Sequence, residues 1–328
     1  MEIKDVSIIG AGPIGMYATV YSLIRVMSVN LIESMPEYGG QPNSSYPQKD
    51  IYDLPMFTNI KAEDVIARLE SQIEYNRKDL LDVTFNEEIV KIEKEQDYFK
   101  ITGKDNKEYY SKTILLTTGS GILTPRKIGI ENEDKLPNIF YTVKDLAVFD
   151  NKTVSILGGG DSALDWALIL KDSAKKVNIV HRRNEYRAKE DSIEKLNNSN
   201  VNQYMNYLVE EVNEVANHTE ITLQEKDTKN EVKLEQDIIL VNYGNVSKVS
   251  DFGGLKVASN VFGYETNRLF ETNIEGLYAC GNAAHYEGKP KLISVGFGEV
   301  PVVINTIKGY VDPSSKGKVF YSSVSASK

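Results

Sequence analysis

The sequence predicts an α/β protein made of two domains of similar plan, each with a parallel sheet packed against helices. An apolar stretch at residues 6–9 runs into a glycine-rich turn and then a helical pattern that continues to about residue 25. The same arrangement recurs from residue 154, where an apolar stretch runs through the glycine-rich turn at 158–163 into a helix around Trp166, which indicates a duplicated βαβ unit. A chain of 328 residues is long enough for two such domains, at about 150 residues each.

The remaining elements follow from the periodicity of the apolar residues. In the first half we expect a strand at 28–32, an amphipathic helix at 63–77, short alternating strands over 83–103 and a strand at 113–117. In the second half we expect strands at 177–180 and 238–241. The glycine-rich segments 119–121 and 244–248 interrupt the pattern and are suited to crossings between the domains.

The last part of the chain is assigned by its helical pattern and its charges. A final helix is expected to start near Gly298 and to run towards Lys308, with Glu299 as an acidic residue at its N-terminus. Local lysines are the candidates for docking an acidic protein, and these are Lys289, Lys291, Lys316 and Lys318.

Composition and charge narrow the class of protein. Hydrophobic residues make up 41% and charged residues 26% of the chain, which is the balance of a soluble globular protein and not of a disordered one. A net charge of −9 argues against a nucleic-acid partner, because binding phosphates needs an excess of Lys and Arg. No apolar run approaches the ~20 residues that span a bilayer, and residues 1–5 do not resemble a signal peptide. We therefore expect a cytoplasmic protein without a membrane partner.

The first glycine-rich turn has the spacing of a dinucleotide-binding motif. Gly10 permits the tight turn, Gly12 lets a pyrophosphate approach the backbone, and Gly15 lets the helix pack on the sheet. The start of that helix offers N–H groups and a positive dipole to the phosphates. Glu33 ends the next strand, where its carboxylate can bind both hydroxyls of an adenosine ribose and would repel a 2′-phosphate. The motif predicts FAD or NAD as ligand; the alternative is a purely structural turn.

The second glycine-rich turn has the opposite charge at the equivalent place. Ala163 replaces the third glycine, which still allows close packing of the helix. Arginines follow the second strand, and a guanidinium group binds phosphate oxygens through two parallel hydrogen bonds. The pattern predicts NADP bound through its 2′-phosphate; the alternative is a solvated basic turn. The residues assigned to this site are Gly158, Gly160, Asp161, Ser162, His181, Arg182, Arg183 and Arg187.

Taken together, these motifs resemble those of the thioredoxin-reductase-like flavoproteins, and among them the bacterial ferredoxin(flavodoxin)–NADP⁺ reductases that lack a redox dithiol. The resemblance covers essentially the whole chain. Besides the two glycine turns it rests on Gly39-Gly40-Gln41, Tyr46-Pro47, Ile51-Tyr52-Asp53, Ala279-Cys280-Gly281 and Gly296-Phe297-Gly298-Glu299.

This resemblance implies an organisation and a set of partners. It implies two Rossmann-like, three-layer ββα nucleotide-binding domains. The FAD-binding domain comprises residues 1–118 and 246–328, with a C-terminal tail that covers the flavin, and the NADPH-binding domain comprises residues 119–245. It also implies a homodimer that takes electrons from NADPH and passes them to ferredoxin or flavodoxin.

The single cysteine distinguishes between branches of this family. Cys280 can form no intramolecular disulfide, and the positions of the two redox cysteines of thioredoxin reductases fall at about Tyr141 and Lys144 here. Electrons cannot leave by thiol–disulfide exchange, which favours a one-electron carrier as acceptor. The alternatives are an NADPH-dependent diaphorase, a thioredoxin-reductase-like flavoprotein with another acceptor, and a non-enzymatic NADPH- or flavin-binding regulator.

The resemblance also assigns residues around the flavin. Tyr46 and, from the tail, Tyr321 are expected to stack on its two faces, where aromatic contact contributes on the order of 1 kcal/mol. Asn282 stands where relatives usually carry an aspartate that binds the ribityl and pyrophosphate region. Further FAD contacts are implied at Gln41, Ile89, Leu123 and Ser323.

Beyond the flavin, no catalytic side chain is expected. The three histidines, His181, His218 and His285, are too scattered in the sequence for a catalytic triad or a metal site. The chemistry of hydride and electron transfer belongs to the cofactors, while the protein supplies position and electrostatics.

Overall fold

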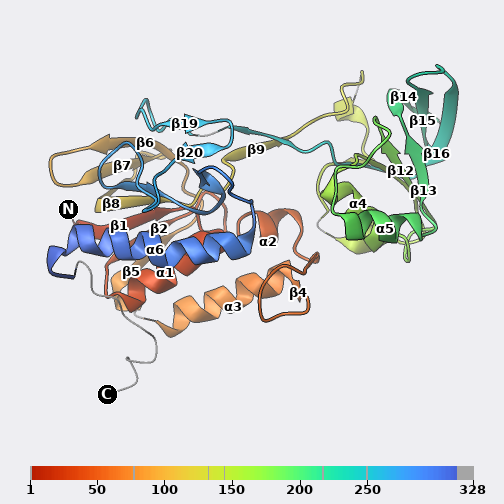
Figure 1. The fold of residues 1–328 in the computed structure, drawn as a ribbon. Coiled ribbons are helices and arrows are strands. Elements are labelled where there is room, and N and C mark those ends of the chain that lie inside the picture. The colour runs from red at the N-terminus through yellow and green to blue at the C-terminus, as the bar shows by residue number, and fades with distance from the viewer. Residues whose placement is uncertain are drawn as a thin grey trace. The chain divides into compact units, whose positions relative to one another are not determined.

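The computed structural model describes residues 2–76, 78–131, 133–143, 145–215, 218–248 and 250–315. The chain forms two compact units: unit 1 is drawn from Met1–Ile122 and Ser247–Lys328, and unit 2 from Leu123–Val246. Unit 2 is therefore one continuous stretch inserted between the two parts of unit 1 (Figure 1). The short strands β9 (Ile122–Pro125) and β18 (Asn245–Lys248) pair with each other at the two crossings.

Unit 1 is built on a seven-stranded sheet with the order β5-β2-β1-β8-β7-β6, in which β21 also pairs with β8. The pairs among β5, β2, β1, β8 and β21 are parallel, whereas β6, β7 and β8 pair antiparallel. The bounds, in that order, are Leu81–Thr84, Val29–Ile32, Lys4–Ile9, Glu108–Leu116, Phe99–Gly103 and Ile89–Lys94, with Leu277–Ala279 for β21. Because β2 is buried along its whole length, it reads in the sequence as an almost unbroken apolar run.

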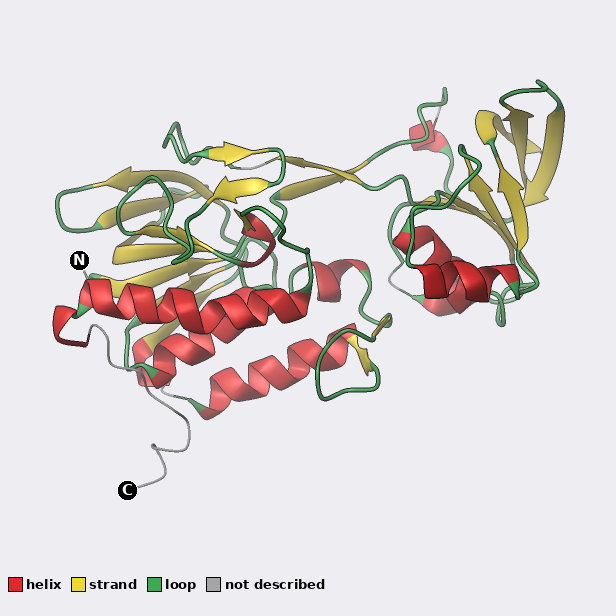
Figure 2. Cartoon of the chain, viewed as in Figure 1, coloured by secondary structure: helices red, strands yellow, loops and turns green. Residues whose placement is uncertain are grey.

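Three helices lie along one face of this sheet: α1 (Pro13–Ile24), α3 (Ala62–Tyr75) and α6 (Ile293–Val311) (Figures 1 and 2). Helix α1 packs against both α3 and α6. The apolar residues of α3 recur every three or four positions and are buried, while the acidic residues of its first turn favour the helix through its dipole. The sequence pattern at 63–77 and the observed helix agree for this reason.

Smaller elements of unit 1 connect these layers. The helical ones are α2 (Gln41–Ser45) and the 3₁₀ turns η1 (Lys78–Leu80), η4 (Gly281–Ala283) and η5 (Pro313–Ser315). The strands β3 (Asp50–Ile51) and β4 (Ile60–Lys61) form a hairpin. The strands β19 (Ser259–Asn260), β20 (Gly263–Glu265) and β22 (Ala284–His285) form a small separate sheet.

Unit 2 contains a five-stranded parallel sheet with the order β10-β17-β11-β12-β13. The bounds in that order are Ile139–Phe140, Ile238–Val241, Thr153–Leu157, Lys176–His181 and Asn202–Met205. The helices α4 (Asp161–Leu170) and α5 (Glu190–Asn197) pack together, and the 3₁₀ turns are η2 (Glu133–Lys135) and η3 (Leu146–Phe149). An antiparallel sheet follows from β14 (Tyr207–Val215), β15 (His218–Glu225) and β16 (Glu231–Gln236).

Both units place a glycine turn between a central parallel strand and a helix. In unit 1 the turn joins β1 to α1, and in unit 2 it joins β11 to α4. The predicted α/β fold with two Rossmann-like domains is confirmed. In the described part of the chain, no helix is both long enough and apolar enough to cross a bilayer.

The expected start of the final helix near Gly298 is wrong. Helix α6 begins at Ile293 and contains Pro301 in its interior. Gly296 and Gly298 read as helix breakers in a sequence, but Gly296 is buried where α6 meets α1, and a Cβ there would lie 2.5 Å from Ile14 Cδ1. The close approach of the two helices therefore favours a glycine here, because a larger residue would displace the Ile14 side chain.

Candidate functional site

The first glycine turn is closely packed at Gly10 and Gly15 and has free space at Gly12. Gly10 has φ +105°, and a Cβ there would lie 2.6 Å from the carbonyl oxygen of Thr117, which follows β8. A Cβ on Gly15 would lie 1.8 Å from the Gly10 oxygen. At Gly12, by contrast, the nearest neighbour of a Cβ would be the Gly40 Cα at 4.0 Å. The turn therefore leaves space beside Gly12 and the start of α1, where helix N–H groups lack intrahelical partners.

Glu33 lies against this turn. It follows β2, its side chain is buried, and its Oε2 accepts a 2.6 Å hydrogen bond from the Ala11 N–H. Its Oε1 accepts from the Met35 N–H at 2.9 Å and from the Ser34 hydroxyl at 3.1 Å. A carboxylate has about four acceptor positions, so Glu33 keeps capacity for a ribose hydroxyl while its orientation is set by backbone groups.

The segment after β2 brings a second pair of glycines to the same place. The Gly39 N–H donates to the Ala11 oxygen at 2.8 Å. Gly40 has φ +57°, and a Cβ on it would come within 3.0 Å of the Gly12 Cα. Helix α2 starts at the next residue, so the structure places Gln41 beside the first glycine turn.

Tyr46 ends α2, half-buried and close to a cation. The Lys49 ammonium lies 5.8 Å from the centre of its ring, and burial raises the pKa of the Tyr46 hydroxyl. The phenol is therefore neutral at physiological pH. Its ring is available as an apolar surface.

Asn282 and Ile89 approach the turn from two other elements. Asn282 lies in η4, directly after β21, and its half-buried amide has no hydrogen bond among the described residues. Ile89 begins β6 and packs in the same core cluster as Ile9 and Ile32, the last residues of β1 and β2. The loop before Ile89 is tied to Glu33, because the Glu87 N–H donates to the Glu33 oxygen at 2.9 Å.

Some predicted contacts cannot be placed. Leu123 lies in β9, but its side chain is outside the described part of the structure. Tyr321 and Ser323 fall outside the described residues, as do the tail lysines Lys316 and Lys318. Their assigned roles stay predictions.

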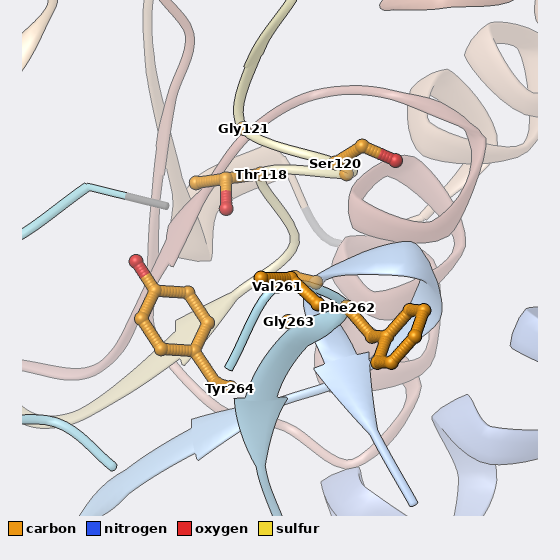
Figure 3. Close-up of a pocket in the computed structure, with 9 residues that line it drawn as sticks. Thr118, Ser120, Gly121, Val261, Phe262, Gly263 and Tyr264 are labelled. Atoms are coloured by element: carbon orange, nitrogen blue, oxygen red, sulfur yellow. The ribbon is translucent and has the colours of Figure 1, made fainter. Parts of the chain in front are cut away.

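A small cavity lies where the end of β8 meets the β19–β20 hairpin (Figure 3). Thr118 to Gly121 form one side, residues 261–264 the other, and Ala283 completes the lining. Its volume is about 10 Å³, room for about one water molecule. The Phe262 ring stacks on His285 at 5.1 Å, which assigns this histidine a packing contact.

The second glycine turn packs against the backbone of Asn242 and the ring of His181. A Cβ on Gly158 would lie 2.5 Å from the Asn242 oxygen, and one on Gly159 would lie 2.2 Å from the His181 Nδ1. Gly160 caps α4, whose first two residues, Asp161 and Ser162, are exposed. The Asp161 Oδ1 accepts from the Lys189 N–H at 2.9 Å, so this carboxylate ties the start of α4 to the start of α5.

His181 is the last residue of β12 and sits between the glycine turn and the arginines. It is buried, its ring stacks on Tyr186 at 5.7 Å, and its Nε2 lies 3.1 Å from the Glu185 carbonyl oxygen. That contact requires the proton on Nε2. Burial lowers the pKa of His181, and the charges of the neighbouring arginines lower it further, so the ring is neutral.

The arginine loop folds back onto the glycine turn. The Arg187 N–H donates to the Gly159 oxygen at 2.7 Å, and Arg187 forms an isolated β-bridge with Gly160. Arg182 and Arg187 are exposed and Arg183 is half-buried. Within the described ranges, none of the three guanidinium groups forms an ion pair or a side-chain hydrogen bond. Guanidinium groups without a protein partner can bind an anion such as a phosphate.

A family model described as pyridine nucleotide-disulphide oxidoreductase matches residues 4–299. The chain belongs to that family. It is 40% identical to the ferredoxin–NADP reductase of Ligilactobacillus salivarius (strain UCC118), over 93% of this chain and 90% of the relative. It is 38% identical to ferredoxin–NADP reductase 2 of Bacillus subtilis (strain 168), over 98% and 96%. The predicted resemblance to ferredoxin–NADP reductases is confirmed, and this family member is an oxidoreductase.

Solved structures agree on the fold. The thioredoxin reductase of Lactococcus lactis superposes with a TM-score of 0.81 at 25% identity, covering 94% of this chain and 99% of that one. The thioredoxin reductase of T. acidophilum gives 0.82 at 21% identity, with the same coverage. These two matches show the same fold over both units.

This oxidoreductase has no reactive thiol in the described structure. Cys280 is completely buried after β21, and burial raises the pKa of its thiol. Tyr141, at the expected position of one redox cysteine, has a buried hydroxyl without a hydrogen-bond partner among the described residues. Lys144, at the other position, lies outside them. The described ranges also contain no group of three or more His, Cys, Asp or Glu side chains that could hold a metal.

Two expectations about charged residues are wrong. Lys289, a candidate for docking an acidic carrier, has a side chain only 4% exposed and forms a 2.7 Å ion pair with Glu299. Glu299 is the seventh residue of α6, and it is buried instead of capping the N-terminus. The sequence predicts a docking lysine and a helix N-terminal acid because sequence spacing does not reveal that the two residues, on different elements, pair with each other.

Proposed function

We propose that this oxidoreductase is a ferredoxin/flavodoxin–NADP⁺ reductase that uses FAD and NADPH. The observation that carries the proposal is the opposite charge of its two glycine turns. A buried carboxylate, Glu33, lies beside the first, and three unpaired arginines lie beside the second. A carboxylate selects an unmodified ribose and guanidinium groups select a 2′-phosphate.

FAD is assigned to unit 1, in the domain of residues 1–118 and 246–328. The space beside Gly12 and the start of α1 fits a pyrophosphate, and Glu33 fits the adenosine ribose. Gln41 and Asn282 supply neutral polar groups from two further elements, and the backbone of Ile89 is assigned the contact with the adenine. Tyr46 is assigned one flavin face, and Tyr321 with Ser323 the other; Leu123 is assigned a contact at the crossing.

NADPH is assigned to unit 2, in the domain of residues 119–245. Arg182, Arg183 and Arg187 hold the 2′-phosphate, and Gly158, Gly160 and Ser162 leave the N–H groups at the start of α4 free for the pyrophosphate. His181 fills the space over Gly159 and, being neutral, adds no charge to the arginines. We therefore assign His181 the role of orienting the arginine loop through its contacts with Gly159 and Glu185.

When bound, FAD would accept a hydride from NADPH, pass its two electrons one at a time to the acceptor and release the remaining proton to solvent. The side chains of the protein are assigned no proton transfer; they bind and orient the two nucleotides and exclude water from the hydride transfer. No residue is assigned as a catalytic acid or base. Since the chain has a single cysteine, which is buried, a one-electron carrier fits as acceptor better than a disulfide.

Ferredoxin or flavodoxin is accordingly proposed as the physiological partner. We also propose a cytoplasmic location and a homodimer, which the family resemblance implies. Sedimentation of the full chain tests the homodimer, and a monomer at micromolar concentration would contradict it.

The function is tested by a spectrum and a comparison of acceptors. The purified protein should be yellow, bleach on addition of NADPH, and then reduce ferredoxin or flavodoxin but not thioredoxin. Reduction of thioredoxin at a similar rate would support the alternative acceptor. A protein that takes up no FAD would overturn the proposal.

A further inference from the structure

A buried ion pair encloses a single glycine in unit 1. The Lys289 and Glu299 side chains are each 4% exposed, and their Nζ and Oε1 atoms are 2.7 Å apart. The Glu299 Oε2 accepts from the Gly281 N–H at 2.7 Å, and the Lys289 Nζ donates to the Gly281 oxygen at 2.6 Å. One acid and one base thus hold both backbone polar groups of Gly281. We refer to Lys289 and Glu299 as the Gly281 clamp.

A third residue completes the surroundings of the clamp. The Tyr286 hydroxyl donates to the Glu299 Oε1 at 2.8 Å, and its ring centre lies 4.9 Å from the Lys289 ammonium. Desolvation lowers the pKa of Lys289, and hydrogen bonding to Glu299 opposes that shift. A buried pair of this kind contributes little net stability compared with an apolar pair of the same size. An apolar pair, however, cannot accept from an N–H or donate to a carbonyl, so the clamp gives orientation that packing alone does not.

Gly281 links the clamp to the first glycine turn. Its φ is +62°, and a Cβ there would lie 3.0 Å from the Ile14 Cγ1. Ile14 belongs to the glycine turn and α1, and it also contacts Gly296 of α6. Gly281, which the clamp holds, therefore packs against Ile14 at the start of the helix of the dinucleotide motif, and a side chain at position 281 would contact Ile14.

The residue after Gly281 is Asn282, whose amide has no hydrogen bond among the described residues. An amide carries no net charge, so it recognises hydroxyl or phosphate groups only through hydrogen bonds with good geometry. The charge of a carboxylate at this position would interact electrostatically with the ligand over a longer distance than an amide's hydrogen bonds do. The direction of the backbone at Gly281 therefore matters more for Asn282 than it would for an acid.

We propose that Lys289 and Glu299 are positioning residues for FAD, which fix Gly281 and so aim Asn282 at the ribityl and pyrophosphate region. This inference rests on the proposed FAD site in unit 1. Both residues act through the backbone of one turn, at Gly281.

The test is a double-mutant cycle on FAD binding to the full chain stripped of flavin. Asn282→Ala and Lys289→Met should each raise the Kd for FAD at least 10-fold. In the Asn282→Ala background, Lys289→Met should add less than threefold, because the clamp acts through Asn282. Independent, multiplicative losses would overturn the proposal.

A second variant separates positioning from folding. Lys289→Met with Glu299→Leu removes both buried charges but leaves the Gly281 N–H without its acceptor, so the protein should unfold at a temperature below that of the wild type and above that of Lys289→Met alone. Its Kd for FAD should still be raised at least 10-fold, and its visible circular dichroism altered, with NADPH binding to unit 2 unchanged. A Kd for FAD within twofold of the wild type would show that Lys289 and Glu299 have only a structural role, and would overturn the inference.

A matched control is available in β1. Lys4 is a mostly buried lysine paired with Glu2 and Asp82 at 2.6 and 2.7 Å, at the end of the strand opposite to the glycine turn. Lys4→Met should leave the Kd for FAD within twofold. Wild-type protein that binds no FAD would refute the proposed function itself, whereas FAD binding with an unaffected Lys289→Met variant would refute only the clamp.

Discussion

The arginine loop after β12 gives the most direct test of cofactor choice. Arg183 is half-buried, so its hydrogen bonds to a 2′-phosphate are expected to contribute about 1.5–3 kcal/mol, as charge-assisted bonds do. Since about 1.4 kcal/mol corresponds to tenfold in affinity, Arg183→Ala should raise the Kd for NADPH roughly 10- to 150-fold. Arg182 is exposed and more strongly screened, so Arg182→Ala should cost about 1 kcal/mol, or roughly fivefold.

The assay compares NADPH with NADH in the same protein. NADH lacks the 2′-phosphate, so its Kd should stay within twofold, and the difference between the two nucleotides isolates the arginines. Lys176→Ala, an exposed cation at the opposite end of β12, is the control and should change neither Kd. Removing an arginine also relieves repulsion among the three cations, so the unfolding temperature should not fall. An unchanged ratio of NADPH to NADH affinity in the Arg182→Ala, Arg183→Ala double variant would refute the assignment.

Contacts and burial in the structure give three other predictions. Gly15→Ala should destabilise unit 1 by about 2–4 kcal/mol in urea unfolding and abolish FAD binding, because its Cβ would lie 1.8 Å from the Gly10 oxygen; a stable, yellow variant would contradict this. Because burial lowers the pKa of His181 in the folded state, the stability from its neutral ring is complete above the unfolded-state pKa of about 6.5 and is lost as the pH falls through the lower folded-state pKa. The free energy of unfolding of the wild type should show this loss at low pH, and that of His181→Gln should not. Identical pH profiles for the two proteins would show that His181 does not cause the loss. The buried Cys280 thiol should resist a thiol reagent at pH 8 until the protein is unfolded, and Cys280→Ala should keep NADPH oxidation, whereas rapid labelling of the native protein would contradict its burial.

The sequence alone was sufficient for the features that are local along the chain. A strand, a glycine turn and a helix are set by neighbouring residues, so the turns at Gly10 and Gly158 could be predicted with their flanking elements. The acid at Glu33 and the arginines from Arg182 carry their charge in their identity, and the end of a parallel strand places them beside the turn. The family could be predicted for the same reason, because its motifs are contiguous.

The tertiary structure decided the features that depend on partners from elsewhere in the chain. Gly296 looks like a helix breaker until Ile14 of α1 is seen against it, and only then is its place inside α6 explained. Lys289 and Glu299 look like solvated charges, since lysine is almost never buried without a partner, but the loop that carries one meets the helix that carries the other around Gly281. Burial and pairing are properties of three-dimensional contact, and the order of residues along a chain does not contain them.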